Sequence, residues 1–135
     1  MISRVETSLS TNPPSPKRGE IWLVNLDPTV GSEIKKTRPA VIVSSDALGR
    51  LPLRLIAPIT EWKDYFKGSI WHIRVDPDGR TGLSKASSID ALQLRGVDTS
   101  RCIKKFGNLP SAVMEELVAE ELKEFLIETE RIKPE

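Results

Sequence analysis

One arginine of this chain has the chemistry and the setting to bind a phosphate group. Arg38 ends a run of six residues, 33–38, that holds one acid and three bases within the polar segment 27–39. Clustered bases attract a phosphate backbone, and a planar guanidinium donates two parallel hydrogen bonds to phosphate oxygens, which lysine cannot do. Pro39 favours an extended backbone at Arg38 and so helps to fix the direction of its side chain. The alternative is that segment 27–39 is only a solvated connection between two strands.

A hydroxyl group could add a second hydrogen-bond donor to a phosphate group bound at Arg38. Thr60, at the end of a predicted strand, can donate to the same phosphate oxygens. RNA can be cleaved without a metal ion because its own 2′-hydroxyl attacks the adjacent phosphorus, so an enzyme needs only to align the attack, move protons and stabilise charge. The sequence has no Walker loop, no dinucleotide fingerprint and no carboxylates spaced for a divalent metal. A reaction without metal or cofactor is therefore favoured.

The single histidine, His72, excludes a catalytic pair of histidines. We predict it to be a packed or surface residue of a strand, with contact to a substrate as the alternative.

Seven short apolar runs, rich in β-branched and aromatic residues, predict strands. They cover residues 21–26, 40–44, 51–59, 70–75, 83–87, 88–95 and 102–106. Turn signals such as Asp76-Pro-Asp-Gly79 separate them. Many short strands without a long helix between them predict a mainly β fold, a small, strongly bent antiparallel barrel of the SH3-like type.

One amphipathic helix is predicted near the C-terminal end. From Pro110 to about Glu128, apolar residues recur at spacings of three and four, and acids occupy the remaining face. Pro110 suits the first helical position, where a missing N–H costs nothing. We expect this helix to pack on the barrel.

Length and composition fit one compact domain of 135 residues. Residues 1–16 are polar and proline-rich and are predicted to be a disordered or loosely attached arm, 17–129 the domain, and 130–135 a tail. The single cysteine, Cys102, excludes an intrachain disulfide and fits a reducing, cytoplasmic setting. No apolar segment approaches the length of a membrane span, and no secretory signal is expected.

Charge is divided unevenly along the chain. Residues 111–135 hold eight acids and three bases, whereas residues 1–110 hold 17 bases and 11 acids. Residues 1–110 are therefore basic although the net charge of the chain is only +1. This low net charge argues against tight, non-specific binding to a nucleic-acid duplex. An acidic solvated helix beside an ordinary barrel is the alternative explanation.

Two segments, KRGEIWLVNLDPTVGSE and KTRPAVIVSSD, resemble the opening of the MazF/PemK family of toxin endoribonucleases. The resemblance in the order of apolar runs extends from Lys17 to about Ile127. Its most specific marks are Arg-Gly-Glu before the first strand, Gly-Ser-Glu, Arg-Pro before a Val/Ile run, and Pro-Ile-Thr at the end of the next strand. The resemblance implies a metal-independent endoribonuclease, with Arg38 and Thr60 as the main catalytic residues, Glu33 nearby and a 2′,3′-cyclic phosphate as product.

The roles of these residues follow from their chemistry. Arginine keeps its proton because its pKa exceeds about 12, so we predict Arg38 to be an electrostatic stabiliser rather than a proton carrier. Glu33 is predicted to be a base or a positioning group; an exposed ion pair with Lys35 or Lys36 is the alternative.

A reader of single-stranded RNA also needs stacking surfaces and base-edge contacts. Trp62, Tyr65 and Phe66 follow Thr60 closely enough to stack on bases, although one or two of them are equally expected in the core. The predicted RNA-binding residues are Ser32, Lys35, Lys36, Thr37, Trp62, Tyr65 and Gln93.

The segment SSIDALQLRGVD departs from the pattern of the family. There the Gln-x-Arg follows an acidic residue directly, whereas here Leu92 takes that place and the nearest acid is Asp90. Its role in base selection or in dimer formation is therefore open.

The resemblance implies a homodimer, a single-stranded RNA substrate and a small antitoxin whose acidic, apolar tail occupies the RNA groove. Two other functions stay open: a non-enzymatic inhibitor of DNA gyrase like CcdB on the same barrel, and an inert or diverged RNA- or protein-binding domain. Arg38 together with Thr60 favours the enzyme, because a protein binder has no need of that pair.

Overall fold

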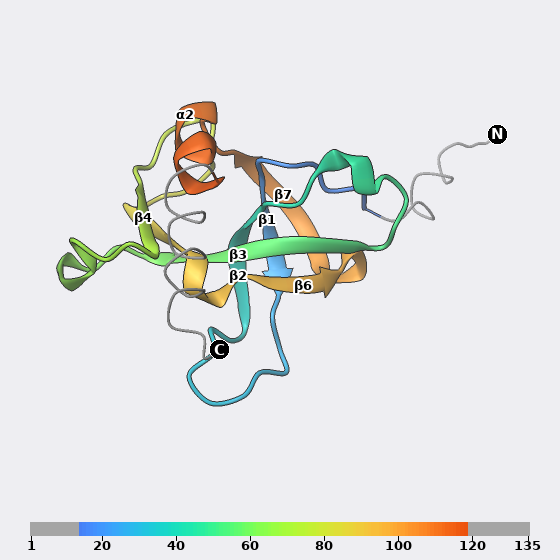
Figure 1. Cartoon of the computed structure of the whole chain (residues 1–135), viewed down its shortest axis with the longest axis horizontal. Coiled ribbons are helices and arrows are strands. Elements are labelled where there is room, and N and C mark those ends of the chain that lie inside the picture. The colour runs from blue at the N-terminus through green and yellow to red at the C-terminus, as the bar shows by residue number, and fades with distance from the viewer. Residues whose placement is uncertain (1–13, 119–135) are drawn as a thin grey trace, which may run out of the picture.

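The computed structural model describes residues 14–118 and shows a bent, mainly antiparallel sheet with a short helix at one end (Figure 1). The strands are β1 (Glu20–Asn25), β2 (Thr37–Ile42), β3 (Leu53–Glu61), β4 (His72–Val75), β5 (Ser87–Asp90), β6 (Arg95–Asp98) and β7 (Cys102–Asn108). Four 3₁₀ turns, η1 (Asp46–Leu48), η2 (Asp64–Phe66), η3 (Ala91–Gln93) and η4 (Thr99–Arg101), and the helix α2 (Ser111–Glu115) complete the described elements.

The sheet is arranged around β3. Its strand order is β4-β5-β3-β2-β1-β7, and β6 pairs with β3 beside β5. The beginning of β3 pairs with β6, its middle with β2 and its end with β5, all antiparallel. The predicted mainly β, antiparallel fold is confirmed, whereas these pairings do not link β4 to β7 and so do not show closure into a barrel.

The core lies on both sides of the two central strands. One cluster of buried residues includes Val41, Ala57 and Ile59, and a second includes Ile42 and Ile56. Neighbouring residues of β2 and β3 therefore serve opposite sides, which explains why both strands read as nearly continuous apolar runs. Strands packed on both faces form a rigid support for the polar side chains at their ends.

Two strand boundaries differ from the predictions in a way that matters for the site. β2 begins at Thr37, so that Arg38 and Pro39 belong to a strand and not to the preceding loop. β3 continues to Glu61, so that Thr60 lies inside a strand. Pairing with β1, which sets Val24 opposite Arg38, extends β2 beyond its apolar part.

Three strand predictions need correction. Residues 83–86 form no strand, although 83–87 was predicted as one. The predicted strand 88–95 is interrupted by η3, because the Asp90 carboxylate accepts a hydrogen bond from the Leu92 N–H at 3.1 Å and turns the chain. β4 is two residues shorter than predicted, since residues 70 and 71 belong to the turn that precedes it.

The helix α2 begins at Ser111, one residue after the predicted start, because Pro110 is its N-cap and not its first helical residue; its apolar side chains point inward. α2 is followed by a π-helical turn at 116–118, and Met114 and Leu117 are buried in the first core cluster. The remainder of the predicted helix, to Glu128, lies outside the described residues. No helix within residues 14–118 is long and apolar enough to cross a membrane.

The segment before β1 is attached to the far end of β3. Pro16 is fully buried, and its carbonyl accepts a hydrogen bond from the Arg54 Nε at 3.0 Å. Arg54 is itself only 6% exposed, and its guanidinium also donates to the carbonyls of Gly49, Leu51 and Leu53. The packed part of the chain therefore begins before residue 17, where the domain was predicted to start; residues 1–13 of the predicted arm lie outside the described part.

Candidate functional site

Arg38 and Thr60 line the same hollow of about 290 Å³, here called the Arg38 hollow. The β2–β3 register pairs Ala40 with Pro58, and the same register continued by two residues sets Arg38 opposite Thr60. Arg38 is exposed and Thr60 is partly exposed. The structure therefore brings the two predicted catalytic side chains to one solvent-open place.

The Arg38 guanidinium is bound through its Nε, and its two terminal nitrogens are free within the described residues. Its Nε donates a hydrogen bond to the Lys35 carbonyl at 3.3 Å. Within residues 14–118, its two terminal nitrogens make no hydrogen bond and no ion pair. An anion entering the hollow would meet the free edge of the guanidinium, the one suited to bidentate binding.

Two charged residues that the sequence did not single out also line the Arg38 hollow. Lys85 adds a second positive charge, and Glu61 contributes a carboxylate. Glu61 lies 4.0 Å from the Lys63 ammonium, and both side chains are well exposed, so this ion pair is weak. Lys85 belongs to a segment remote from Arg38 in sequence, and no local pattern indicates that the two meet.

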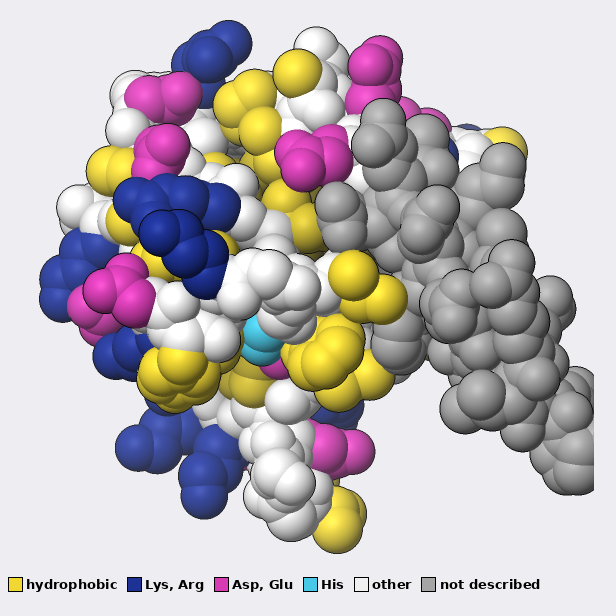
Figure 2. Space-filling view, turned by 60° about the vertical axis from the view of Figure 1, so that its left-hand side comes forward, with side chains coloured by type: hydrophobic (Ala, Val, Ile, Leu, Met, Phe, Trp, Pro, Cys, Tyr) yellow, Lys and Arg dark blue, Asp and Glu magenta, His cyan; other side chains and the backbone are white. Residues whose placement is uncertain are grey.

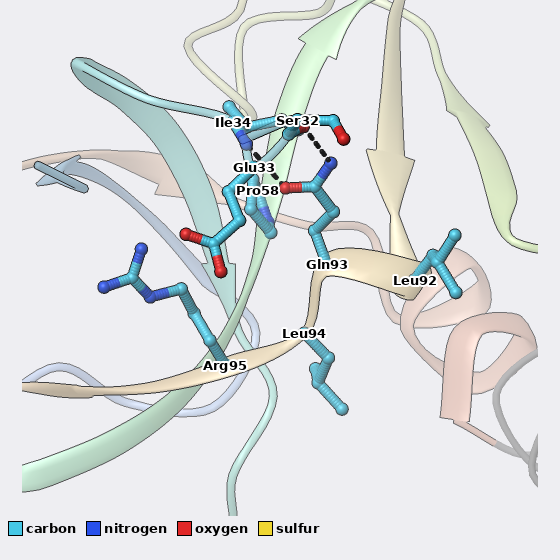
Figure 3. A pocket seen from close by; sticks show the side chains of 8 residues that line it. All are labelled: Ser32, Glu33, Ile34, Pro58, Leu92, Gln93, Leu94 and Arg95. Atoms are coloured by element: carbon cyan, nitrogen blue, oxygen red, sulfur yellow. Dashed lines mark hydrogen bonds between the residues drawn. The ribbon is translucent and has the colours of Figure 1, made fainter. Parts of the chain in front are cut away.

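Glu33 does not line the Arg38 hollow. It lines a second hollow of about 370 Å³, here called the Gln93 hollow, together with Ser32, Ile34, Pro58, Leu92, Gln93, Leu94 and Arg95 (Figure 3). The Glu33 carboxylate accepts a hydrogen bond from the Val30 N–H at 2.7 Å, within its own loop. Among the described residues it forms no ion pair with Lys35 or Lys36, the alternative raised from the sequence.

Most of the predicted RNA-binding residues lie on two projecting connections, 26–36 between the paired strands β1 and β2, and 62–71 between β3 and β4 (Figure 1). The first carries Ser32, Lys35 and Lys36, all exposed, and Thr37 follows as the exposed first residue of β2. Tyr65, in the second, is 81% exposed, which leaves its ring free to stack on a base. Trp62 is less free, since the Arg74 guanidinium lies 5.1 Å from the centre of its ring.

His72 belongs to a packed polar group that sequence reasoning did not foresee. Phe66 stacks on its ring at 3.7 Å, and its Nδ1 is hydrogen-bonded to the Ser88 Oγ at 3.0 Å. Burial lowers the pKa of His72, while the nearby Asp90 carboxylate opposes the shift; burial raises the pKa of Asp90. The sequence predicted a packed or surface residue of a strand for His72, and the structure shows it packed within β4.

The face that holds this group is mixed in chemistry. In Figure 2 the histidine is partly visible near the centre, among hydrophobic and uncharged side chains, and Lys and Arg side chains gather on the left-hand part. The described residues contain no group of three or more His, Cys, Asp or Glu side chains placed to hold a metal ion.

Comparisons with known proteins give the same family repeatedly. A family model described as PemK-like, MazF-like toxin of type II toxin–antitoxin systems matches residues 17–126. The chain is 32% identical over 104 residues to the endoribonuclease PemK of Escherichia coli, covering 76% of each chain. It is 33% identical over 107 residues to the endoribonuclease MazF9 of Mycobacterium tuberculosis, covering 75% of this chain and 88% of the relative.

Solved structures agree with these relatives. MazF from Deinococcus radiodurans superposes with a TM-score of 0.68 at 25% identity, over 84% of this chain and 97% of that one. A MazE–MazF complex from the same organism matches with a TM-score of 0.63 at 25% identity, over 84% of this chain and 96% of that one.

Proposed function

This chain belongs to the PemK-like, MazF-like family of toxins of type II toxin–antitoxin systems, and we propose that it is the endoribonuclease of such a system, acting on single-stranded RNA. The observation that carries the proposal is the shared, solvent-open hollow of Arg38 and Thr60. Both curated relatives are named endoribonucleases, which supports the same activity here.

The proposed reaction uses the substrate's own nucleophile. The 2′-oxygen attacks the adjacent phosphorus, the bond from phosphorus to the 5′-oxygen breaks, and the products are a 2′,3′-cyclic phosphate and a 5′-hydroxyl. Arg38 binds the non-bridging phosphate oxygens and stabilises the charge that grows on them, and the Thr60 hydroxyl donates to the same oxygens. No step in this scheme requires a metal ion.

The two acids receive different roles. Glu61 lines the Arg38 hollow and is proposed to accept the proton of the 2′-hydroxyl, while solvent protonates the departing 5′-oxygen. Glu33 was expected to be a base or a positioning group; its contact with the Val30 N–H favours the positioning role, within the loop that precedes Arg38.

The proposal is tested with purified protein and a long mixed RNA in the presence of EDTA. We expect cleavage to a limited set of ends carrying 2′,3′-cyclic phosphate, and a loss of at least about 10²-fold for Arg38→Ala. Arg50→Ala is the matched control, because Arg50 is exposed near the other end of β3. Intact RNA together with inhibition of DNA gyrase would overturn the proposal in favour of the CcdB-like alternative.

We also propose that the protein is a homodimer and is neutralised by a cognate antitoxin. A MazE–MazF complex is among the similar solved structures, and an acidic tail suits a hollow that contains Arg38 and Lys85. Sedimentation equilibrium should give about twice the chain mass of 15.1 kDa. A monomer at micromolar concentration would contradict the dimer.

A further inference from the structure

Gln93 uses both ends of its side-chain amide to hold the connection between β1 and β2. Its Oε1 accepts a hydrogen bond from the Ile34 N–H at 2.6 Å, and its Nε2 donates to the Ser32 carbonyl at 3.3 Å. Figure 3 shows the amide reaching from η3 to this loop backbone, whereas Leu92 points away from it. The contact joins residues about 60 positions apart in sequence, so it fixes the loop to the sheet.

The turn that carries Gln93 is itself well anchored. Asp90 caps η3 by accepting from the Leu92 N–H, and the Ala91 N–H donates to the Trp71 carbonyl at 2.8 Å. Asp90 and Ala91 are both buried. Gln93 therefore projects from a turn that is itself held to the sheet, and its amide ties the loop to that turn.

Ile34, whose N–H Gln93 binds, directly precedes Lys35, whose carbonyl binds the Arg38 side chain. Ile34 is fixed by Gln93, and the carbonyl of the next residue, Lys35, accepts the hydrogen bond from the Arg38 Nε. Two further bonds close the base of the loop: the Leu26 N–H donates to the Lys36 carbonyl, and the Lys36 N–H donates to the Asp27 carboxylate, each at 2.9 Å. A movement of the loop at Ile34 would pass to the Arg38 guanidinium through one peptide unit.

We propose that Gln93 is a positioning residue that latches the β1–β2 loop and thereby aims the Arg38 guanidinium into its hollow; this role rests on the proposed function. It differs from the role predicted from the sequence, in which Gln93 contacts RNA. Each of these two bonds uses half of the hydrogen-bonding capacity of its atom, so the amide keeps one acceptor site and one N–H and is no longer free to turn towards a base edge without breaking them.

The structural half of the proposal is tested without any RNA. Gln93→Met keeps the length of the side chain and removes both hydrogen bonds, whereas Gln93→Glu keeps an acceptor for the Ile34 N–H and sets a carboxylate against the Ser32 carbonyl. We expect hydrogen exchange at the Ile34 amide to rise about tenfold in Gln93→Met and less in Gln93→Glu. The NMR signal of the Arg38 Nε–H should shift or broaden in the same order. Leu92→Ala removes an exposed neighbour in the same turn and should leave both signals unchanged.

The kinetic half separates latching from base reading. Latching predicts that Gln93→Met lowers kcat about 10- to 100-fold at unchanged cleavage ends, because misplacement of a catalytic group costs rate. Added to Arg38→Ala, it should cause little further loss, since both changes act through one group. A changed set of cleavage ends with kcat preserved would show that Gln93 reads a base and would overturn the latch.

Failure of the latch and failure of the proposed function give different results. If the wild-type protein cleaves RNA while Ile34 exchange and the Arg38 signal do not respond to Gln93→Met, the latch is wrong and the nuclease stands. If the wild-type protein leaves RNA intact while both signals respond, the latch on Arg38 stands and the nuclease is wrong.

Discussion

At the scale of single residues, the proposed site contains one hydroxyl, that of Thr60, which bonds to no other group in the described part of the chain. The Thr60 side chain makes no hydrogen bond within residues 14–118, although it lies in a strand packed between two apolar clusters. A hydroxyl with no structural partner, in the hollow that Arg38 also lines, is free to donate a hydrogen bond to a ligand from outside the protein.

The first prediction concerns Thr60→Val, which removes the hydroxyl and keeps the shape of the side chain. We expect RNA cleavage to fall about 10²-fold, as for the loss of one oxyanion donor, and the free energy of unfolding to change by less than about 1 kcal/mol. Single-turnover rates and urea titrations measure the two effects. Unchanged cleavage would remove Thr60 from the mechanism.

The second prediction distinguishes the two acids. Glu61→Gln should slow cleavage about 10²-fold or more if its carboxylate accepts the proton, because the amide cannot do so. Glu33→Gln keeps an oxygen able to accept from the Val30 N–H and should cost much less. Pre-steady-state cleavage of one short RNA by both variants measures the difference. The reverse order of the two losses would return the role of base to Glu33.

The third prediction concerns the single cysteine. Cys102 is 3% exposed, and burial raises the pKa of its thiol to about 11, so the reactive thiolate is scarce at neutral pH. We expect the folded protein to resist iodoacetamide at pH 7.5 and to react within minutes in concentrated urea, as followed by mass spectrometry. Rapid alkylation of the folded protein would show that β7 opens readily.

At the scale of elements, the packed group around His72 on β4 and β5 should make stability depend on pH. The His72 imidazole is covered by Phe66 and faces Ser88 and Asp90, and burial lowers its pKa below the usual value of about 6.5. As the pH falls below about 6.5, the unfolded chain takes up a proton that the folded chain resists, so the free energy of unfolding decreases.

The fourth prediction concerns the change of stability with pH that the lowered pKa of His72 causes. The free energy of unfolding of the wild-type protein should decrease between pH 7.5 and 5.5, and the decrease should be smaller in His72→Gln. The raised pKa of Asp90 acts in the opposite direction and at lower pH, where protonation of its buried carboxyl favours the folded state. Urea titrations at both pH values test this; an equal decrease in the two proteins would exclude His72 as the cause.

The fifth prediction concerns the wall of the Arg38 hollow. A methyl group added at Gly107 of β7 would overlap the backbone of Arg80 and Thr81, beside the segment that lines the hollow. Gly107→Ala should therefore destabilise the protein by about 2 kcal/mol or more, as overpacking does. Gly96 on β6 has open space at the same position, so Gly96→Ala should change stability by less than about 1 kcal/mol. Thermal unfolding of the pair measures the contrast.

The sequence predicted the positions of secondary-structure elements better than the contacts between residues that are distant along the chain. The strands that became β1, β3 and β7 and the start of α2 were found because apolar periodicity and turn residues are local signals. The break at η3 was missed because it depends on a hydrogen bond from the Leu92 N–H to the Asp90 side chain, which replaces a bond within the sheet. The contact of Gln93 with Ile34 was missed because it joins distant parts of the chain. Arg38 was found from its type and its neighbours, whereas Glu61 and Lys85 became candidates only once the strands were in place.

At the scale of the whole molecule, part of the excess positive charge of residues 1–110 lies around the Arg38 hollow. Lys35, Lys36 and Arg38 lie on the loop and strand beside the Arg38 hollow, and Lys85 lines the hollow itself. A strand of RNA that places one phosphate at Arg38 would pass these bases with its neighbouring phosphates. Each contact with a phosphate releases a bound counterion, so affinity should depend on salt in proportion to the number of contacts.

The last prediction measures that number. RNA methylated at every 2′-oxygen lacks the nucleophile and stays intact, so its dissociation constant can be followed from 50 to 300 mM salt by fluorescence anisotropy. Each phosphate neutralised on a single strand contributes about 0.7 to the slope of log affinity against log salt. Lys35→Gln should therefore lower the slope by about that amount, whereas Arg50→Gln, near the other end of β3, should leave it unchanged. A flat dependence in the wild-type protein would mean that RNA does not follow the basic loop, and the place of Arg38 as the phosphate clamp would be lost with it.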